Sequence, residues 1–501
     1  MRGRHTELFS MYKRASSKDH LNTIDREEIP GEPQSDEWKD IGNPSWKRPL
    51  PHVLVATLSS FLFGYHLGIV NDTLESISLD LGFNGSTMAE GLVVSTCLGG
   101  AFIGSIFSGW ISDGLGRRRA FQLCALPMII GASISATTSR LEGMLLGRFL
   151  VGTGMGLGPP VAALYVSEVS PAFVRGTYGS FTQIATCLGL MASLVIGIPA
   201  KNVLGWWRVC FWIPAIPATL LAFLMEFSTE SPQWLFKRGR ISQTEEELGR
   251  LMGASHVKSA MAEMSKSDRG DEEVDVVKFS ELLHGPHCRV VFIGSAIFAF
   301  QQLSGINAVF YFSSTVFKSA GVPSDIGNIC VGIVNISGSV VAMILMDRLG
   351  RKLLLLWSFL GMAVAMGIQV LAASDILSDS ENLYLSVGGM LMFVLTFSLG
   401  AGPVPSLLLS EILPSRIRAK AMAFCMAVHW LRVIPYLSCH QVINFFVGLL
   451  FLRMLELMGP QILYSIFATF CLMAVVFVKK NVIETKGKSL QDLEMALLPA
   501  D

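Results

Sequence analysis

The feature that most constrains this chain is a series of twelve apolar segments, each of 18 or more residues. At about 1.5 Å per residue, a helix of that length crosses a hydrocarbon core about 30 Å thick. The segments lie at residues 53–76, 90–111, 120–138, 143–165, 178–200, 208–227, 289–316, 326–346, 353–373, 386–410, 423–452 and 461–479. Charged residues make up only 16% of the 501 residues, against about 25% in a typical soluble domain. The pattern predicts an all-α membrane protein with twelve transmembrane helices.

One long hydrophilic stretch separates the first six segments from the last six. Basic residues gather in this stretch and in alternate short loops, which the positive-inside rule assigns to the cytosol together with both termini. The predicted domains are a cytosolic disordered tail (1–50), a first six-helix bundle (51–227), a cytosolic helical linker (228–288), a second six-helix bundle (289–479) and a cytosolic tail (480–501).

The composition also sets several classes of function aside. A net charge of +0 gives no sign of a nucleic-acid partner. The nine cysteines contain no CxxC pair, so we expect neither a metal site nor a disulfide framework. No nucleophile–base constellation is visible, which argues against an enzyme and against a cofactor.

Charged landmarks repeat in the same order in the two halves. The matched pairs are Gly116-Arg117-Arg118 with Gly350-Arg351-Lys352, Glu168 with Glu411, Arg175 with Arg418, and Glu230 with Glu484. Internal repeats of this kind are typical of transporters and predict two pseudo-symmetric six-helix bundles.

The seventh segment contains the most specific string, Gln301-Gln302-Leu303-Ser304-Gly305-Ile306-Asn307-Ala308-Val309-Phe310-Tyr311. It resembles the sugar-binding signature of the sugar porter family of the major facilitator superfamily, and the similarity runs from residue 51 to 496. Two short stretches, 64–71 and 400–405, look most like the plant plastidic glucose translocator group. The resemblance implies the major facilitator fold and a plastid (chloroplast) envelope location. Because the acidic N-terminus is unlike a transit peptide, the Golgi and the plasma membrane stay open.

Neutral amides inside the predicted helices are the candidate sugar contacts. A sugar hydroxyl both donates and accepts, and an amide offers both functions without the desolvation cost of a charge. By resemblance, the residues that align with the family's sugar contacts are Gln183, Gln301, Gln302, Asn307, Asn335, Asn444 and Trp430. An isolated amide such as Gln183 can also serve only as a hydrogen bond between helices.

The geometry of the amides requires broken helices. On an unbroken helix Gln301 and Asn307 would point about 240° apart, so they can share a cavity only if the helix unwinds near Ser304. In the tenth segment, Pro403 and Pro405 remove two helical hydrogen bonds. We therefore predict two broken helices that line a cavity near the middle of the membrane, as alternating access uses.

Charged residues near the cytosolic ends of the helices could pair across the two halves, and the resemblance implies that they form a cytosolic gate. They are Asp113, Arg117, Arg118, Arg148, Glu168, Arg175, Glu230, Asp347, Arg351, Glu411, Arg418 and Glu484. Ordinary anchoring of positive loops is the alternative interpretation.

His66 is the candidate residue for energy coupling. Proton-driven members of the family carry an Asp at this position of the first helix, so its replacement favours facilitated diffusion. A histidine can itself carry a proton, and it can also be a polar residue that is hydrogen-bonded inside the bundle.

Residues 431–441 interrupt the resemblance in the eleventh segment. Family members place an Asn three residues after the Trp, whereas eleven extra residues separate Trp430 from Asn444 here. The internal repeat agrees, since the paired glutamates are 62 positions apart in the first half and 73 in the second. Eleven residues add about 16 Å of helix. The insert therefore either bulges at the cytosolic end and leaves Asn444 in the site, or disables the helix, as a splice variant or gene-model product would.

The sequence thus favours a hexose uniporter, with glucose as the expected cargo, that acts as a monomer in the lipid bilayer. A proton-coupled sugar symporter and a transport-incompetent sugar sensor are the alternatives.

Overall fold

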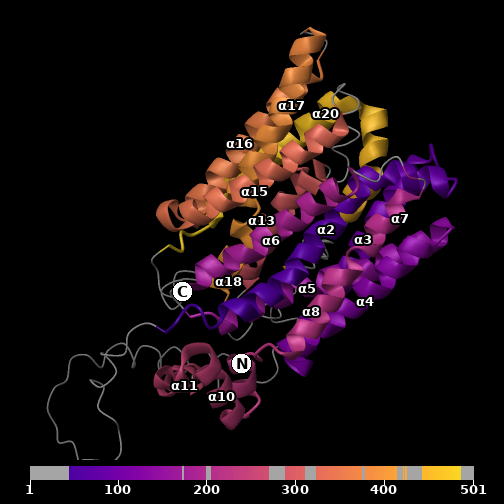
Figure 1. Ribbon diagram of the computed structural model, residues 1–501. Helices are drawn as coiled ribbons and strands as arrows, with labels where there is room; N and C mark the ends of the chain where they lie inside the picture. Colours follow the sequence, from indigo (N-terminus) through magenta and orange to yellow (C-terminus); the bar gives the residue numbers. More distant parts are fainter. Residues whose placement is uncertain are drawn as a thin grey trace, which may run out of the picture. The chain divides into compact units, whose positions relative to one another are not determined.

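The computed structural model describes residues 44–171, 174–198, 203, 205–269, 288–307, 309–310, 317, 323–374, 378–413, 421–422, 424–425 and 443–486 (Figure 1). Within these ranges every regular element is a helix. Ten helices of the described residues are long and apolar enough to cross a membrane, and one further apolar helix is shorter.

The first half contains six predicted spans, and the helices cover all of them. They are α2 (Leu50–Asp80), α3 (Thr87–Leu115), α4 (Arg117–Thr137), α5 (Leu141–Val169), α6 (Arg175–Ile196), and a sixth span made of α7 (Trp206–Trp212) and α8 (Ala215–Glu226). Pro214 stands at the N-cap of α8, and because proline has no backbone N–H it ends the run of α7 hydrogen bonds.

The second half contains two interrupted spans and one kink. Its helices are α13 (Cys288–Leu303), α15 (Ser324–Leu349), α16 (Arg351–Ala372), α17 (Asp379–Thr396), the π-helical turn η3 (Phe397–Ala401), α18 (Val404–Ile412) and α20 (Ile443–Asn481). α20 turns at Gly459, where φ is 77°, directly before Pro460. Its two arms therefore belong to the eleventh and twelfth predicted spans, and residues 426–442, with the insert, lie outside the described residues.

Close backbone approach holds the first half together. A Cβ on Gly152 of α5 would lie 2.0 Å from the carbonyl oxygen of Cys97 on α3, and one on Gly156 would lie 2.0 Å from that of Ala101. Only glycine permits this spacing, which is how helices pack tightly where lipid removes the hydrophobic driving force.

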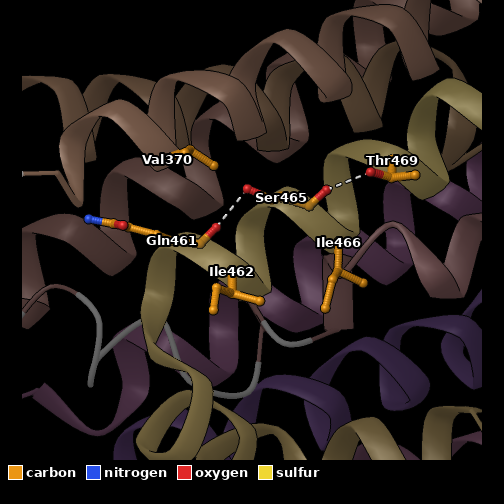
Figure 2. A pocket seen from close by; sticks show the side chains of 6 residues that line it. All are labelled: Val370, Gln461, Ile462, Ser465, Ile466 and Thr469. Carbon is orange, nitrogen blue, oxygen red and sulfur yellow. Dashed lines mark hydrogen bonds between the residues drawn. The ribbon is translucent and has the colours of Figure 1, made fainter.

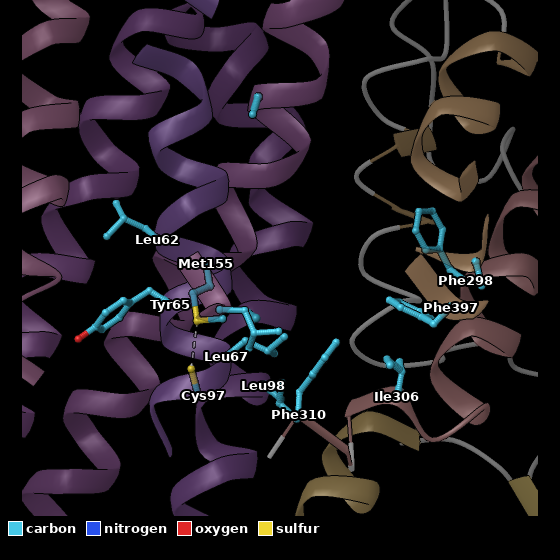
Figure 3. Packing of buried hydrophobic residues seen from close by; sticks show 14 of the residues in the cluster. Leu62, Tyr65, Leu67, Cys97, Leu98, Met155, Phe298, Ile306, Phe310 and Phe397 are labelled. Atoms are coloured by element: carbon cyan, nitrogen blue, oxygen red, sulfur yellow. Dashed lines mark hydrogen bonds between the residues drawn. The ribbon is translucent and has the colours of Figure 1, made fainter. Parts of the chain in front are cut away.

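Buried apolar side chains fill each half (Figure 3). In the first half, the Sγ of Cys97 on α3 lies 3.4 Å from the Sδ of Met155 on α5. In the second half, the rings of Phe310 and Phe397 meet edge to face with centroids 6.2 Å apart. Among the described residues, the halves are in contact mainly where α6 packs on α15 and α3 packs on α20, and α5 also touches α18.

Three short helices follow the sixth span. They are α9 (Pro232–Lys237), α10 (Ile241–Met252) and α11 (Ala254–Arg269), all within the predicted linker. Arg48, just before α2, donates from Nη1 to the carbonyl oxygen of Gly249 on α10 at 3.1 Å. The entry to the first span is thereby tied to the linker helices.

Candidate functional site

The seventh span breaks where the sequence predicts. α13 ends at Leu303, and Ser304 and Gly305 form a turn before the chain is helical again at Ile306. Gly305 has φ +90°, and a Cβ there would lie 2.7 Å from the ring of Phe467. Both the backbone conformation and the contact require glycine, so the predicted break is confirmed.

The tenth span breaks as well. α17 ends at Thr396 and is followed by η3 and by a turn at Gly402 and Pro403 before α18 begins. The N–H of Gly402 donates to the carbonyl oxygen of Phe397 at 2.9 Å, five residues back, which is the π-helical pattern. This prediction is also confirmed.

Amides from both halves converge on this second break. Gln301 of α13 donates from Nε2 to the carbonyl oxygens of Ala401 at 2.6 Å and Gly402 at 3.5 Å. Gln183 of α6 places its Nε2 3.4 Å from the position that a Cβ on Gly402 would occupy. Asn335 of α15 accepts a hydrogen bond at 2.7 Å from the hydroxyl of Ser398 in η3. The structure therefore brings three of the predicted sugar contacts to one place.

The remaining amides of the seventh span pair with each other. Asn307 donates from Nδ2 to the Oε1 of Gln302, across the turn at Ser304 and Gly305. Both side chains are buried. Asn444 is the second residue of α20. Its side chain and the whole of Trp430 lie outside the described residues.

One buried acceptor in this cluster, the Oε1 of Gln301, is open, meaning that it accepts no hydrogen bond from the described residues. Gln301 is 6% exposed, and its Oε1 has no hydrogen-bond partner among the described residues. A buried carbonyl oxygen without a donor costs about 1–3 kcal/mol. A ligand hydroxyl that donates to it would remove that cost.

A groove lies on the surface of the second half, between α16 and α20. It has a volume of about 380 Å³ and is lined by Val370, Gln461, Ile462, Ser465, Ile466 and Thr469 (Figure 2). Gln461 donates to the carbonyl oxygen of Ala373 at 2.7 Å, and the two hydroxyls donate to carbonyls of α20 itself. Since both hydroxyl protons and one N–H of Gln461 are already used, this groove offers fewer free donors than the amide cluster and is a poorer candidate for a sugar site.

His66 and Arg148 form a buried pair in the first half. Arg148 is 1% exposed and donates from Nη1 to the main-chain carbonyl of His66 at 3.4 Å and from Nε to that of Val93 at 3.2 Å. Neither ring nitrogen of His66 has a hydrogen-bond partner among the described residues. Within the described residues the ring thus lacks the hydrogen bond expected of a polar group tied into the bundle, and the role of His66 stays a prediction.

The location of Arg148 corrects the sequence analysis, which grouped it with the cytosolic charges. Arg148 and Glu168 both lie on α5, but twenty positions separate them, or about 30 Å of helix. Arg148 is therefore in the opposite part of the span and belongs with His66.

The first-half cluster (Asp113, Arg117, Arg118, Glu168 and Glu230) is built around one buried arginine. Arg117 donates to both oxygens of Glu168, at 2.8 Å and 2.9 Å, and to Asp113 at 3.4 Å. Glu230 accepts from the backbone N–H groups of Arg117 at 2.9 Å and Arg118 at 3.3 Å. A carboxylate at the first two N–H groups of α4 also complements the helix dipole.

The second-half cluster (Arg351, Glu411, Glu484 and Thr485) repeats this plan with one change. Glu484 accepts from the backbone N–H groups of Arg351 at 2.9 Å and Lys352 at 3.0 Å. Arg351 donates from Nη2 to Glu411 Oε1 at 2.8 Å, while the other oxygen of Glu411 accepts from the hydroxyl of Thr485 at 2.6 Å. Arg351 and Thr485 thus share Glu411.

These pairs tie each half together. Every contact just described joins residues of the same half, so these pairs do not bridge the halves as the sequence analysis expected. Arg175 is exposed at the start of α6, the side chain of Asp347 is outside the described residues, and so is Arg418.

The pKa values of the two capping glutamates, Glu230 and Glu484, are shifted in opposite directions. Burial raises the pKa of Glu230 above its ordinary value, and the backbone N–H donors, led by Ser231, offset only part of that effect. Burial alone would also raise the pKa of Glu484, but N–H donors led by Lys486 outweigh it, so the pKa lies below its ordinary value. The difference follows from the deeper burial of Glu230.

Several residues of the site were missed in the sequence. Ser398 and Ser358 hold the second break, Cys187 and Ser339 meet across the halves at 3.1 Å, and Thr485 shares Glu411. A hydroxyl inside an apolar span is the available signal, but serine and threonine commonly bond their own helix. Which of them reach another helix depends on tertiary packing.

Comparison with known proteins gives consistent matches. Residues 52–497 match the family model described as "Sugar (and other) transporter". The chain is 69% identical over 501 residues to the probable plastidic glucose transporter 2 of Arabidopsis thaliana, covering 99% of each chain. It is 65% identical over 498 residues to probable plastidic glucose transporter 3 of the same plant, covering 99% of this chain and 97% of that protein. The solved structure of the proton:xylose symporter XylE bound to 6-bromo-6-deoxy-D-glucose is similar with a TM-score of 0.79 and 30% identity, covering 90% of this chain and 99% of XylE.

Proposed function

This chain belongs to the sugar transporter family of the major facilitator superfamily, and we propose that it carries a hexose, glucose first of all, by alternating access. It is a multi-pass membrane protein of the major facilitator fold and not an enzyme. Its relatives at 69% and 65% identity carry plastidic names, which supports a plastid location, and we infer the envelope membrane from it.

The observation that carries the sugar site is the open Oε1 of Gln301. It is buried at the break between η3 and α18, beside an amide contributed by the other half, Gln183. A sugar bound there would contact both halves at once, which is what a carrier needs to couple binding to movement. With four to six hydrogen bonds of about 0.5–1.5 kcal/mol each, the affinity would be in the millimolar range.

Alternating access requires contacts between the halves that can break. Asn328 of α15 donates to Asp72 of α2 at 2.9 Å, near the ends of these helices away from the cytosol. Cys187 of α6 meets Ser339 of α15. These polar contacts, with the packing of α6 on α15 and of α3 on α20, must separate when the carrier opens, whereas the cytosolic clusters keep each half rigid while it moves. By holding each half rigid, the first-half and second-half clusters contribute to the cytosolic gate.

Facilitated diffusion is the mode that the residues favour. The position where proton-driven members carry an Asp holds His66, and Arg148 donates to its carbonyl. A proton on the imidazole would bring a second positive charge close to the buried guanidinium of Arg148. Like charges in a medium of low dielectric repel strongly.

The eleventh span bears on whether this chain transports. α20 is helical from Ile443 to the turn at Gly459, so Asn444 is the second residue of an arm of sixteen residues, or about 24 Å. That length supports the alternative in which the insert leaves Asn444 in the span as a sugar contact. The proposed carrier works as a monomer in the bilayer. A transport-incompetent sensor is the alternative.

Uptake of labelled glucose into proteoliposomes tests the proposal. We expect saturable uptake that stops at the outside concentration, with or without an imposed proton gradient, and a strong reduction in Gln301→Ala. Gln461→Ala is the matched control, because that amide also donates to a carbonyl but lines the surface groove. Accumulation driven by the proton gradient would replace the uniporter with a symporter, and sugar binding without uptake would replace it with a sensor.

A further inference from the structure

The π-helical turn η3 changes the acceptor toward which one backbone N–H is directed. In an α-helix the N–H of Ala401 would donate to the carbonyl of Phe397, four residues back. Here that carbonyl accepts from Gly402 at 2.9 Å instead. In the π-helical pattern the N–H of Ala401 is directed instead at the carbonyl oxygen of Thr396, five residues back.

The hydroxyl of Ser358 on α16 bonds both of these groups. The N–H of Ala401 donates to Ser358 Oγ at 2.8 Å, and the same hydroxyl donates to the carbonyl oxygen of Thr396 at 2.7 Å. One hydroxyl thus bridges the two sides of the break, and it is 2% exposed. A Cβ on Gly400 would lie 2.6 Å from Ser358 Cβ, so α16 lies directly against this turn.

The bridged π-helical turn η3 orients two of the sugar-contact amides, Gln301 and Asn335. The carbonyl of Ala401, the residue whose N–H Ser358 holds, accepts the Nε2 of Gln301. Ser398, within the same turn, donates to Asn335. If the Ala401 peptide rotated, the acceptor for Gln301 would move with it.

We propose that Ser358 is a positioning residue for the sugar site: its hydroxyl fixes the break in the tenth span so that Gln301 and Asn335 present their amides to the sugar. Ser358 does not touch the sugar itself. The inference rests on the proposed hexose transport.

The test compares glucose KM in proteoliposomes for the full chain and three variants. Ser358→Ala should raise KM about tenfold, the effect of losing one well-placed hydrogen bond to the ligand, and Ser358→Thr, which keeps the hydroxyl, should recover most of it. Ser59→Ala is the matched control, because that hydroxyl is equally buried but bonds its own helix at Ala56; its KM should not change. Size-exclusion profiles and unfolding temperatures establish that each variant is folded.

A double-mutant cycle separates positioning from general destabilisation. In a Gln301→Ala background, Ser358→Ala should have much less effect, because the amide that it orients is gone. Where uptake in that background is too slow to measure, the dissociation constant of glucose gives the same cycle. An unchanged KM in Ser358→Ala, or an equal effect in both backgrounds, would overturn the inference while leaving hexose transport intact. A chain that neither carries nor binds glucose would instead overturn the proposed function and the inference with it.

Discussion

The first-half and second-half clusters follow one plan in different environments. In each, a glycine with positive φ precedes an arginine at the start of a helix, and a glutamate after the last span accepts the first two N–H groups of that helix. The Arg117 and Glu168 side chains are each 6% exposed, whereas Arg351 and Glu411 are 11% and 26% exposed. The two clusters thus share their backbone geometry but differ in the burial of their ion pairs. The same substitution should therefore lower the free energy of unfolding by different amounts in the two halves.

Removal of the central arginine should show the largest difference. Arg117→Ala leaves Glu168 buried without its two-bond partner, and we expect a loss of about 3–5 kcal/mol in stability. Arg351→Ala should cost about 1.5–3 kcal/mol, because Glu411 is more exposed and keeps Thr485. Thermal unfolding of the purified variants in detergent measures both, and equal losses would contradict the comparison.

Substitution of the two glycines should instead give matching results. Gly116 has φ +93° and Gly350 φ +86°, and a Cβ at either would lie within 2.5–2.6 Å of the capping carboxylate. Gly116→Ala and Gly350→Ala should each cost about 1–3 kcal/mol for the strained backbone. The same unfolding assay applies, and a clearly smaller loss for one of them would show that the shared geometry is not equally required.

Thr485 should have a smaller effect, confined to the second half. Thr485→Val removes the hydroxyl that donates to Glu411 and should cost about 0.5–1.5 kcal/mol. The effect should largely vanish in an Arg351→Ala, Glu411→Ala background, which removes the acceptor. An undiminished loss there would mean that Thr485 acts through packing.

The capping glutamates should give the smallest effects, with opposite pH dependence. The pKa of Glu484 is lowered in the folded chain, so its stabilisation is present above its ordinary value of 4.5 and is lost as pH falls below it. The pKa of Glu230 is raised, so as pH falls the folded chain binds a proton at this carboxylate before the unfolded chain does. The free energy of unfolding therefore increases as pH falls through the raised pKa towards 4.5.

Unfolding temperatures measured against pH for Glu484→Gln and Glu230→Gln check these signs. The advantage of the unchanged chain over Glu484→Gln should shrink below pH 4.5, while its difference from Glu230→Gln should move in its favour as pH approaches 4.5 from above. Parallel curves for the two variants would contradict the assigned directions.

Much of the fold could be predicted because it depends on local rules. Apolar segments of spanning length locate the helices, and Gly305 and Pro403 locate the breaks, since φ > 0 and a missing N–H act wherever the chain goes. The partners across helices could not be predicted in the same way. Spacing along α5 already separates Arg148 from Glu168, but its contact with His66 depends on how α2, α3 and α5 pack.

The candidate site shows the same division. The amides were visible as polar residues in apolar spans, and resemblance to a family gave them a role. The positions of Ser358 and Ser398 were not visible, because a serine that bonds its own helix and one that bridges a break look alike in sequence. The effect of residues 431–441 also stays a prediction, since they lie outside the described residues.

Glucose counterflow tests the central claim, carriage of a hexose through a site at the break of the tenth span, most directly. Proteoliposomes loaded with unlabelled glucose are diluted into labelled glucose with no proton gradient, and the labelled sugar inside is followed over time. The account predicts a transient overshoot of label in the unchanged chain, because a carrier exchanges one bound sugar for another, and its near loss in Gln301→Ala. No overshoot, or an equal overshoot in Gln301→Ala, would contradict it.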